Sequence, residues 1–183
     1  YMITRISDNR YVIDMANEKP YGMGVFIDIY PYDGLGTTEK EAVTYGMKGD
    51  RLSSLCYQST REHFAIETTT SLFRKIIKYP IFIGSKLMGK DYFQKKLNQL
   101  VELKEYEDSN YIGCVVWLSG GKKEIFLRKW FDETVMVPFE KYQFRVPKDY
   151  DEVLRHTYGD YMQLPPEKDR IGHHYFKAYR KDE

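Results

Sequence analysis

The sequence is poor in cysteine, nearly neutral in charge and without a long apolar run. Its two cysteines, Cys56 and Cys114, are too few for a disulfide framework and favour a reducing compartment such as the cytoplasm. No apolar stretch approaches the ~20 residues that a transmembrane helix needs, and no secretory signal opens the chain. The 28 basic and 27 acidic residues nearly cancel, which argues against a partner made of nucleic acid. The absences together predict a cytoplasmic globular protein with no transmembrane segment.

The chain is rich in aromatic residues and long enough to fold without disulfides. Its 17 tyrosines and 10 phenylalanines are typical of mixed polar and apolar binding surfaces, and also of ordinary cores. A globule of 183 residues buries roughly 70% of its unfolded surface, so we expect a single domain over residues 1–183. The first residue is Tyr1 rather than methionine, which indicates truncation at the N-terminus relative to a longer native protein.

Hydrophobic patterning predicts strands towards both ends of the sequence and helices between them. The expected strands span residues 11–15, 24–30, 111–118, 125–127, 135–137 and 142–146. The expected helices begin at a capping pattern of Thr38 and Glu41, continue over 52–79 until Pro80, and recur over 90–106 and 149–158. We therefore expect an α+β fold with a small mixed or antiparallel sheet and a helical middle. The strands at 11–15 and 24–30 could pair with one another, and no regular element is expected after residue 159.

A carboxylate stands in the middle of the strand expected at 24–30. Alternation places three branched residues on one face, which we expect to be buried at the centre of the sheet: Val25, Ile27 and Ile29. Asp28 shares the opposite face with Phe26 and Tyr30. A carboxylate among bulky apolar groups needs a cation, a metal ion or several hydrogen-bond donors. Asp28 is therefore either held in a salt bridge or exposed, or part of a functional site.

The last polar segment, residues 158–174, gathers side chains that bind anions or move protons. Arginine can fork onto a phosphate, lysine acts as a point charge and imidazole can relay a proton. The residues of these types are Lys168, Arg170, His173 and His174. Glycine and proline, beginning with Gly159, favour an irregular loop here. The segment is either an anion-binding or catalytic loop, or a solvated tail.

Other patterns favour structural roles. Asp149 and Asp151 stand at the start of an expected helix, where carboxylates cap the helix and interact with its dipole. The consecutive His173 and His174 point in opposite directions in extended backbone and so rarely chelate one ion together. The two cysteines show neither zinc spacing nor a local context that would activate a thiol.

The order of several motifs resembles the LicD family. One motif near the N-terminus is Phe26-Ile27-Asp28-Ile29-Tyr30-Pro31. The motifs near the C-terminus are Tyr158-Gly159-Asp160-Tyr161-Met162, Leu164-Pro165-Pro166, Arg170 and His173-His174. Between them stand Trp130-Phe131, Val137-Pro138-Phe139-Glu140 and Phe144-Arg145-Val146-Pro147. The resemblance covers residues 1–181 and implies the fold of the nucleotidyltransferase superfamily.

This resemblance implies a transferase that moves phosphocholine, or a related phospho group, from a CDP-choline-like donor. The implied acceptor is a glycan or glycolipid of the bacterial surface, such as a lipopolysaccharide or teichoic acid precursor, met in the cytoplasm or at the inner face of the membrane. The implied site residues are Asp28 as a Mg²⁺ ligand, Asp28, His173 and His174 in catalysis, and Gly159, Lys168 and Arg170 at the donor phosphates. The segment after Pro166 would then have to fold back towards Asp28.

The sequence departs from the superfamily pattern in one respect. Enzymes of that superfamily have a Gly-Ser turn followed by an acidic pair, and no such element precedes Asp28. We therefore expect the isolated chain to be inactive. The alternative is a non-catalytic glycan- or partner-binding domain whose aromatic side chains stack on sugars.

Overall fold

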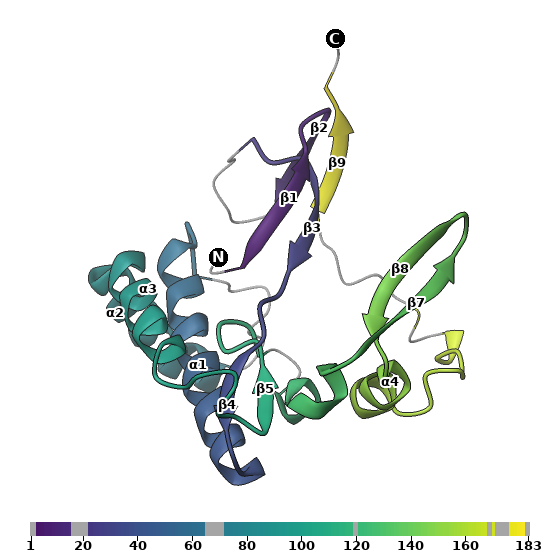
Figure 1. The fold of residues 1–183 in the computed structure, drawn as a ribbon. Coiled ribbons are helices and arrows are strands. Elements are labelled where there is room, and N and C mark those ends of the chain that lie inside the picture. The colour runs from purple at the N-terminus through teal and green to yellow at the C-terminus, as the bar shows by residue number, and fades with distance from the viewer. Residues whose placement is uncertain are drawn as a thin grey trace. The chain divides into compact units, whose positions relative to one another are not determined.

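A computed structural model describes residues 3–15, 22–64, 72–118, 121–167, 170 and 176–181 (Figure 1). The elements in chain order are β1 (Thr4–Asp8), β2 (Tyr11–Met15), β3 (Val25–Ile29), β4 (Asp33–Gly36), α1 (Glu39–Thr60), α2 (Leu72–Met88), α3 (Lys90–Val101), β5 (Tyr111–Gly113), η1 (Gly121–Glu124), β6 (Phe126–Leu127), η2 (Arg128–Phe131), β7 (Thr134–Phe139), β8 (Tyr142–Pro147), α4 (Tyr150–Tyr158) and β9 (Phe176–Arg180). The strand pairs β1–β3, β2–β9, β4–β5, β5–β6 and β7–β8 are antiparallel. The expected α+β class with small antiparallel sheets is thus confirmed, and the wider nucleotidyltransferase-like fold stays a prediction.

The chain forms two compact units. The first comprises Tyr1–Tyr30, Arg51–Asn98 and Arg170–Glu183, and the second comprises Pro31–Asp50 and Gln99–Asp169. The chain passes from one unit to the other within α1 and again within α3. The single domain expected over residues 1–183 stays a prediction.

The first unit contains two strand pairs drawn from distant parts of the sequence (Figure 1). β1 pairs with β3, so that Arg5 lies opposite Asp28, and β2 pairs with β9, so that Tyr11 lies opposite Arg180. The suggested pairing of β2 with β3 is therefore wrong. The true partners, β1 and β9, are short segments rich in polar and charged residues, which give little strand signal on their own.

The expected burial of β3 is also wrong. Ile27 is 70% exposed and Ile29 is 45% exposed, while Val25 is only half-buried. In the part of the chain that is described, β3 pairs with β1 alone. It is therefore one strand of a two-stranded ribbon rather than the buried centre of a mixed sheet.

The opposite face of β3 is the one that neighbouring side chains cover. The guanidinium of Arg5 lies over the ring of Phe26, 4.1 Å from its centroid. The ring of Phe176, from β9, lies 5.9 Å from the Phe26 ring. The face of β3 that carries Phe26 and Asp28 is therefore the one covered by a cation and an aromatic ring, and the face with the isoleucines is the more exposed one.

Helix α1 begins where the capping pattern predicted. The N–H of Glu41 donates to Thr38 Oγ1 at 3.3 Å, and Glu41 Oε2 accepts the N–H of Thr37 at 3.0 Å. This is a capping box whose return bond reaches one residue before the cap. Helix α3 likewise begins at Lys90 as expected and ends at Val101.

Pro80 does not end a helix, contrary to expectation. It lies inside α2, where it removes one backbone hydrogen bond. Beyond it, Phe82 and Ser85 are buried on one face of the helix, at 6% and 2% exposure, and that packing favours its continuation. The continuous helical pattern expected from residue 52 is interrupted, since α1 ends at residue 60 and α2 begins at residue 72.

In the described ranges no helix has the length and apolar character needed to cross a bilayer.

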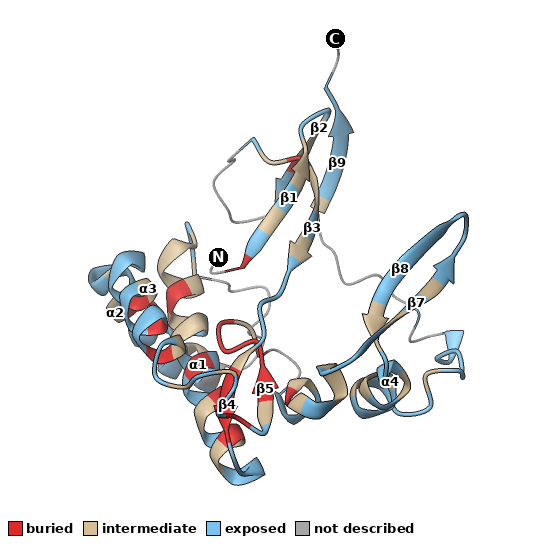
Figure 2. Cartoon of the chain, viewed as in Figure 1, coloured by how far each residue is buried: buried red, intermediate tan, exposed pale blue. Residues whose placement is uncertain are grey.

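The second unit is built on the sheet β4–β5–β6. Its buried apolar side chains are those of Leu35, Ala42, Leu100, Ile112, Cys114, Val115, Val116, Leu118, Ile125 and Phe126 (Figure 2). The strand expected over 111–118 ends at Gly113, and the chain then turns, with Trp117 N–H donating to Cys114 O at 3.1 Å. The apolar run therefore marks burial rather than extended backbone.

Helix α4 follows Asp149 as expected, but that residue makes no side-chain capping hydrogen bond. Asp151, in the first turn, instead accepts from Arg155 Nε at 2.7 Å and from the Tyr161 hydroxyl at 2.6 Å. These two donors lower the pKa of Asp151. Asp151 thus links the first turn of α4 to Arg155 in the same helix and to Tyr161, which follows the helix.

Candidate functional site

Asp28, the expected catalytic carboxylate, is paired with Arg5. Arg5 Nε donates to Oδ1 at 2.6 Å and Nη2 donates to Oδ2 at 3.5 Å, and the Tyr30 hydroxyl lies 3.5 Å from Oδ2. The Arg5 and Asp28 side chains are only 15% and 19% exposed. Of the two alternatives for Asp28, the salt bridge is present in the structure. Its catalytic role stays a prediction.

The described residues around Asp28 do not by themselves fit a Mg²⁺ ion. Magnesium takes six oxygen ligands in near-octahedral geometry, whereas both oxygens of Asp28 already accept hydrogen bonds from a cation. Within the described ranges no group of three or more His, Cys, Asp or Glu side chains is placed to hold a metal ion.

The C-terminal candidates are only partly described. Lys168, His173 and His174 lie outside the described residues. Arg170 is exposed and belongs to the same compact unit as Asp28. Strand β9 returns to that unit and brings Phe176 against Phe26. Strand β9 thus lies in the unit of Asp28. The return of the segment after Pro166 to Asp28 and the roles of the four basic residues stay predictions.

Gly159 belongs to the second unit and ends α4. Its φ is 73°, in the left-handed region that favours glycine, and its N–H donates to Arg155 O at 2.8 Å. A Cβ at this position would meet no atom within 4 Å. The local structure accounts for this glycine as a helix stop, and its expected contact with donor phosphate stays a prediction.

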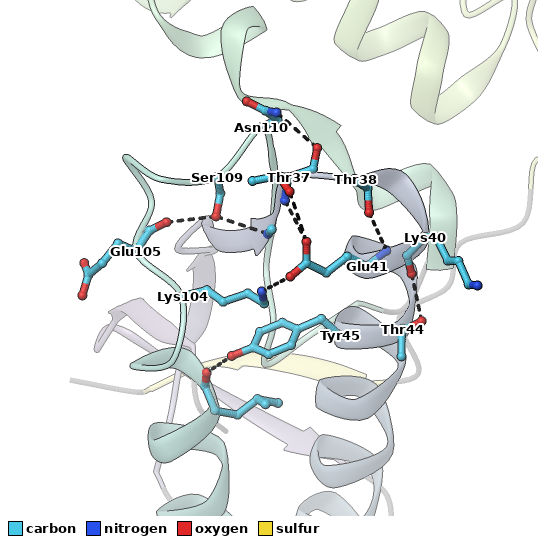
Figure 3. Close-up of polar contacts among 12 residues, drawn as sticks. Thr37, Thr38, Lys40, Glu41, Thr44, Tyr45, Lys104, Glu105, Ser109 and Asn110 are labelled. Atoms are coloured by element: carbon cyan, nitrogen blue, oxygen red, sulfur yellow. Dashed lines mark hydrogen bonds and ion pairs between the residues drawn. The ribbon is translucent and has the colours of Figure 1, made fainter.

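A polar network holds the start of α1 to the end of α3 (Figure 3). Lys104 Nζ forms an ion pair and hydrogen bond with Glu41 Oε1, and the Tyr45 hydroxyl donates to Leu100 O. The hydrogen bond from Lys104 is the main cause that lowers the pKa of Glu41. Glu41 therefore serves the scaffold, as cap and ion-pair partner.

Ser109 and Asn110 extend this network to the strand β4 (Figure 3). Ser109 Oγ accepts from Gly36 N–H at 3.2 Å and donates to Glu105 O at 2.9 Å. Asn110 Nδ2 donates to Thr37 O at 3.1 Å. Beside it lies a hollow of about 280 Å³ lined by Thr37, Asn110, Tyr111, Leu127, Arg128 and Lys129.

A second hollow of about 360 Å³, which we call the Trp130 pocket, lies within the second unit. Its lining is largely apolar with a few charges: Glu39, Val43, Tyr111, Lys122, Lys123, Ile125, Leu127, Trp130 and His156. This volume is near the lower end of the range for small-molecule sites, roughly 300–1,000 Å³. The pocket can therefore admit a small organic group.

Polar groups of the Trp130 pocket are fixed by neighbouring elements. His156 Nε2 lies 3.1 Å from Lys122 O; a carbonyl only accepts, so Nε2 carries the proton. The His156 ring meets the Trp130 ring edge-on, with centroids 5.6 Å apart. Lys122 Nζ lies 3.7 Å from Glu39 Oε1, in an exposed ion pair. The pocket thus combines aromatic faces with one carboxylate and two ammonium groups.

Asp33, in β4, has a carboxylate oxygen, Oδ2, that is buried without a hydrogen-bond partner among the described residues. Burial raises the pKa of Asp33, and the N–H of Val115, which donates to this carboxyl, opposes the rise.

Burial also raises the pKa of the Cys114 thiol to about 11, which makes Cys114 a poor nucleophile near neutral pH.

We expect Asp33→Asn to stabilise the protein at neutral pH. Because the folded pKa lies above the unfolded one, the stability contributed by the protonated carboxyl is full below the unfolded pKa, about 3.9, and is lost as pH rises through the folded pKa. Asparagine does not ionise, so the variant does not lose this stability as pH rises. Its free energy of unfolding at pH 7 should be about 1 kcal/mol higher than that of the wild type. Urea denaturation at a series of pH values should show the difference shrinking towards about pH 4. A variant that is less stable at pH 7 would contradict the assignment.

Sequence reasoning missed most of the Trp130 pocket. Glu39 lies in α1, Lys122 and Lys123 lie in the 3₁₀ turn η1, and His156 lies in α4. No local pattern in the sequence indicates that these three elements meet. Trp130 stood within a motif of the LicD resemblance, and that was the available clue. A pair of lysines beside glycine followed by a tryptophan is otherwise too common a pattern to indicate a site.

One comparison with known proteins gives a clear relative. The lipopolysaccharide cholinephosphotransferase LicD of Haemophilus influenzae is 32% identical over 179 residues, which is 97% of this chain. The chain spans 64% of the length of that relative. No family model and no solved structure matches the chain. Identity at this level across nearly all of the 183 residues confirms the resemblance to the LicD family that was read from the motifs.

Proposed function

We propose that this protein transfers phosphocholine to a lipopolysaccharide or a related cell-surface glycan. The observation that carries the proposal is the similarity of 97% of the chain to a lipopolysaccharide cholinephosphotransferase. Three details of the reaction are also proposals: a CDP-linked donor, a glycan or glycolipid precursor as acceptor, and reaction on the cytoplasmic side of the membrane.

The chemistry of the Trp130 pocket supports a phosphocholine ligand. A trimethylammonium group is attracted to aromatic faces and to carboxylates, which Trp130, Tyr111 and Glu39 supply. A phosphate is attracted to ammonium groups, which Lys122 and Lys123 supply. Both charges of the zwitterion therefore have a partner in one pocket, and we propose that the phosphocholine group binds there.

The roles implied for the motif residues complete the proposal. Asp28, His173 and His174 would act in catalysis, and Gly159, Lys168 and Arg170 at the donor phosphates. Phosphoryl transfer depends mainly on positioning and on neutralising charge. Dependence on Mg²⁺ stays a prediction, because the described residues do not form a metal site. The inactivity expected of the isolated chain also stays a prediction.

Disruption of the gene that encodes these residues should remove phosphocholine from the surface glycan of the source bacterium. The measurement is mass spectrometry of the purified glycan, which reports the mass of one phosphocholine group. A plasmid copy should restore that mass, and a copy with Lys122→Ala and Lys123→Ala should restore at most about a tenth of it. Lys95→Ala with Lys96→Ala, which alters exposed lysines of α3, is the matched control and should restore it fully. An unchanged glycan after disruption would contradict the proposed function.

The alternative is a non-catalytic glycan- or partner-binding domain. The observation in its favour is the Arg5–Asp28 ion pair, which occupies the carboxylate that the LicD resemblance assigns to catalysis. Glycan binding by the chain, together with phosphocholine that persists after gene disruption, would favour this alternative.

A further inference from the structure

We propose that His156 is a positioning residue that makes the Trp130 pocket select phosphocholine over ligands without a phosphate. The inference rests on the proposed binding of phosphocholine in that pocket. It follows from a contact that the transferase proposal does not use, which is the hydrogen bond between His156 and the peptide that joins Lys122 to Lys123.

This hydrogen bond joins α4 to the turn that carries the two lysines. His156 Nε2 donates to Lys122 O at 3.1 Å, and that oxygen belongs to the peptide between Lys122 and Lys123. The same oxygen accepts the N–H of Ile125 at 3.2 Å, which closes the turn. A carbonyl oxygen has two lone pairs, so both bonds can form together. The bond to Ile125 shapes η1, and the bond to His156 ties η1 to α4.

The two lysines differ in what their ammonium groups contact. Lys122 Nζ lies 3.7 Å from Glu39 Oε1, in an exposed ion pair. Lys123 has no ion-pair partner among the described residues, so its ammonium group is available to a phosphate. The peptide that joins these lysines is planar, and His156 holds its oxygen. Both side chains therefore start from a backbone that His156 fixes beside the pocket.

The imidazole of His156 also contacts the aromatic part of the pocket. Its ring centroid lies 5.6 Å from that of Trp130 and 5.7 Å from that of Phe126, and both pairs meet edge-on. Contacts of this kind contribute roughly 0.5–1.5 kcal/mol. One side chain thus links the lysine turn, which we assign to the phosphate, with the tryptophan, which we assign to the trimethylammonium group.

Two substitutions separate the two contacts of His156. Phenylalanine keeps an aromatic ring but cannot donate a hydrogen bond, so it releases the turn η1 from α4. Glutamine places an amide N–H near the position of Nε2 but has no ring. Two ligands separate the ends of the pocket in the same way, because choline has the trimethylammonium group of phosphocholine without the phosphate. A residue that only stabilised the fold would change the affinities for both ligands alike.

The test is a titration of the chain with phosphocholine and with choline, followed by tryptophan fluorescence because Trp130 lines the pocket. We expect the wild type to bind phosphocholine more tightly than choline. His156→Phe should lower the affinity for phosphocholine about fivefold and change that for choline by less than about twofold. His156→Gln should keep the ratio of the two affinities within about twofold of the wild-type ratio.

The matched control is His63→Phe, which alters an exposed histidine of the first unit and should leave both affinities unchanged. Because the His156 side chain is exposed, both of its variants should keep the wild-type circular dichroism spectrum. A wild-type affinity ratio in His156→Phe would overturn the inference and leave the proposed function, which gene disruption tests, as it stands. An equal loss of both ligands in that variant would also overturn it. If the wild type did not bind phosphocholine, the assignment of the Trp130 pocket would be wrong together with the inference.

Discussion

Replacement of Asp28 by alanine is expected to lower the free energy of unfolding by about 2 kcal/mol, because Arg5 then keeps its charge without its carboxylate in a largely shielded position. Chemical denaturation followed by circular dichroism measures this loss. Asp14→Ala, which removes an exposed carboxylate from the strand β2 of the same unit, should change stability by less than about 0.5 kcal/mol. If the two variants were equally stable, the ion pair would contribute nothing to the fold.

The reversed pair, Arg5→Asp with Asp28→Arg, separates the structural role of Asp28 from a catalytic one. Reversal keeps opposite charges facing each other across β1 and β3, so it should recover at least half of the stability lost in Asp28→Ala. It does not return a carboxylate to position 28. A gene copy with the reversed pair should therefore leave the surface glycan without phosphocholine if Asp28 is catalytic. Restored phosphocholine would limit Asp28 to a structural role.

Replacement of Gly49 by alanine is expected to destabilise the protein by about 2 kcal/mol. Gly49 lies in α1 against residue 115, and an added Cβ would overlap the backbone oxygen of Val115 and lie 2.8 Å from its Cγ1. Backbone cannot rotate away as a side chain can. The helix propensity that alanine gains over glycine, about 1 kcal/mol, opposes this cost only in part.

Gly46→Ala is the matched control on the same helix. A Cβ there would first meet Leu118 Cδ2, the tip of a flexible side chain, which can move aside. The helix propensity gained should then leave the stability within about 1 kcal/mol of the wild type. Thermal and urea denaturation of both variants should place Gly49→Ala well below Gly46→Ala, and the reverse order would show that α1 does not pack on residue 115 as described.

Local signals in the sequence predicted local structure well. The capping pattern of Thr38 and Glu41 marked the start of α1, because both partners of a capping box lie within one turn. The amphipathic pattern from Lys90 marked α3 for the same reason. Pro80 shows the limit of such rules, since tertiary packing of Phe82 and Ser85 continues α2 past a residue that disfavours helix.

Strand partners and the candidate site could not be predicted in the same way. Which face of β3 is covered depends on Arg5 and Phe176, which alternation within β3 does not reveal. The pairing of Asp28 with Arg5 follows from the register of β1 on β3, and β1 itself carries little strand signal. The Trp130 pocket depends on residues from α1, β5, η1, η2 and α4 that only the tertiary fold brings together. Motif order identified the family, whereas the geometry of the site required coordinates.

Because β2 pairs with β9, this strand pair can form only after nearly the whole chain has been translated. Tyr11 faces Arg180, so β2 leaves the ribosome long before its partner has been translated. At about 5–20 residues per second, that interval is on the order of ten seconds or more. During it, β2 lacks the partner that covers its edge in the folded protein, and an unpaired edge can associate with other nascent chains. Slower elongation should therefore increase aggregation of this protein, and a chaperone that holds the first strands during translation should reduce it.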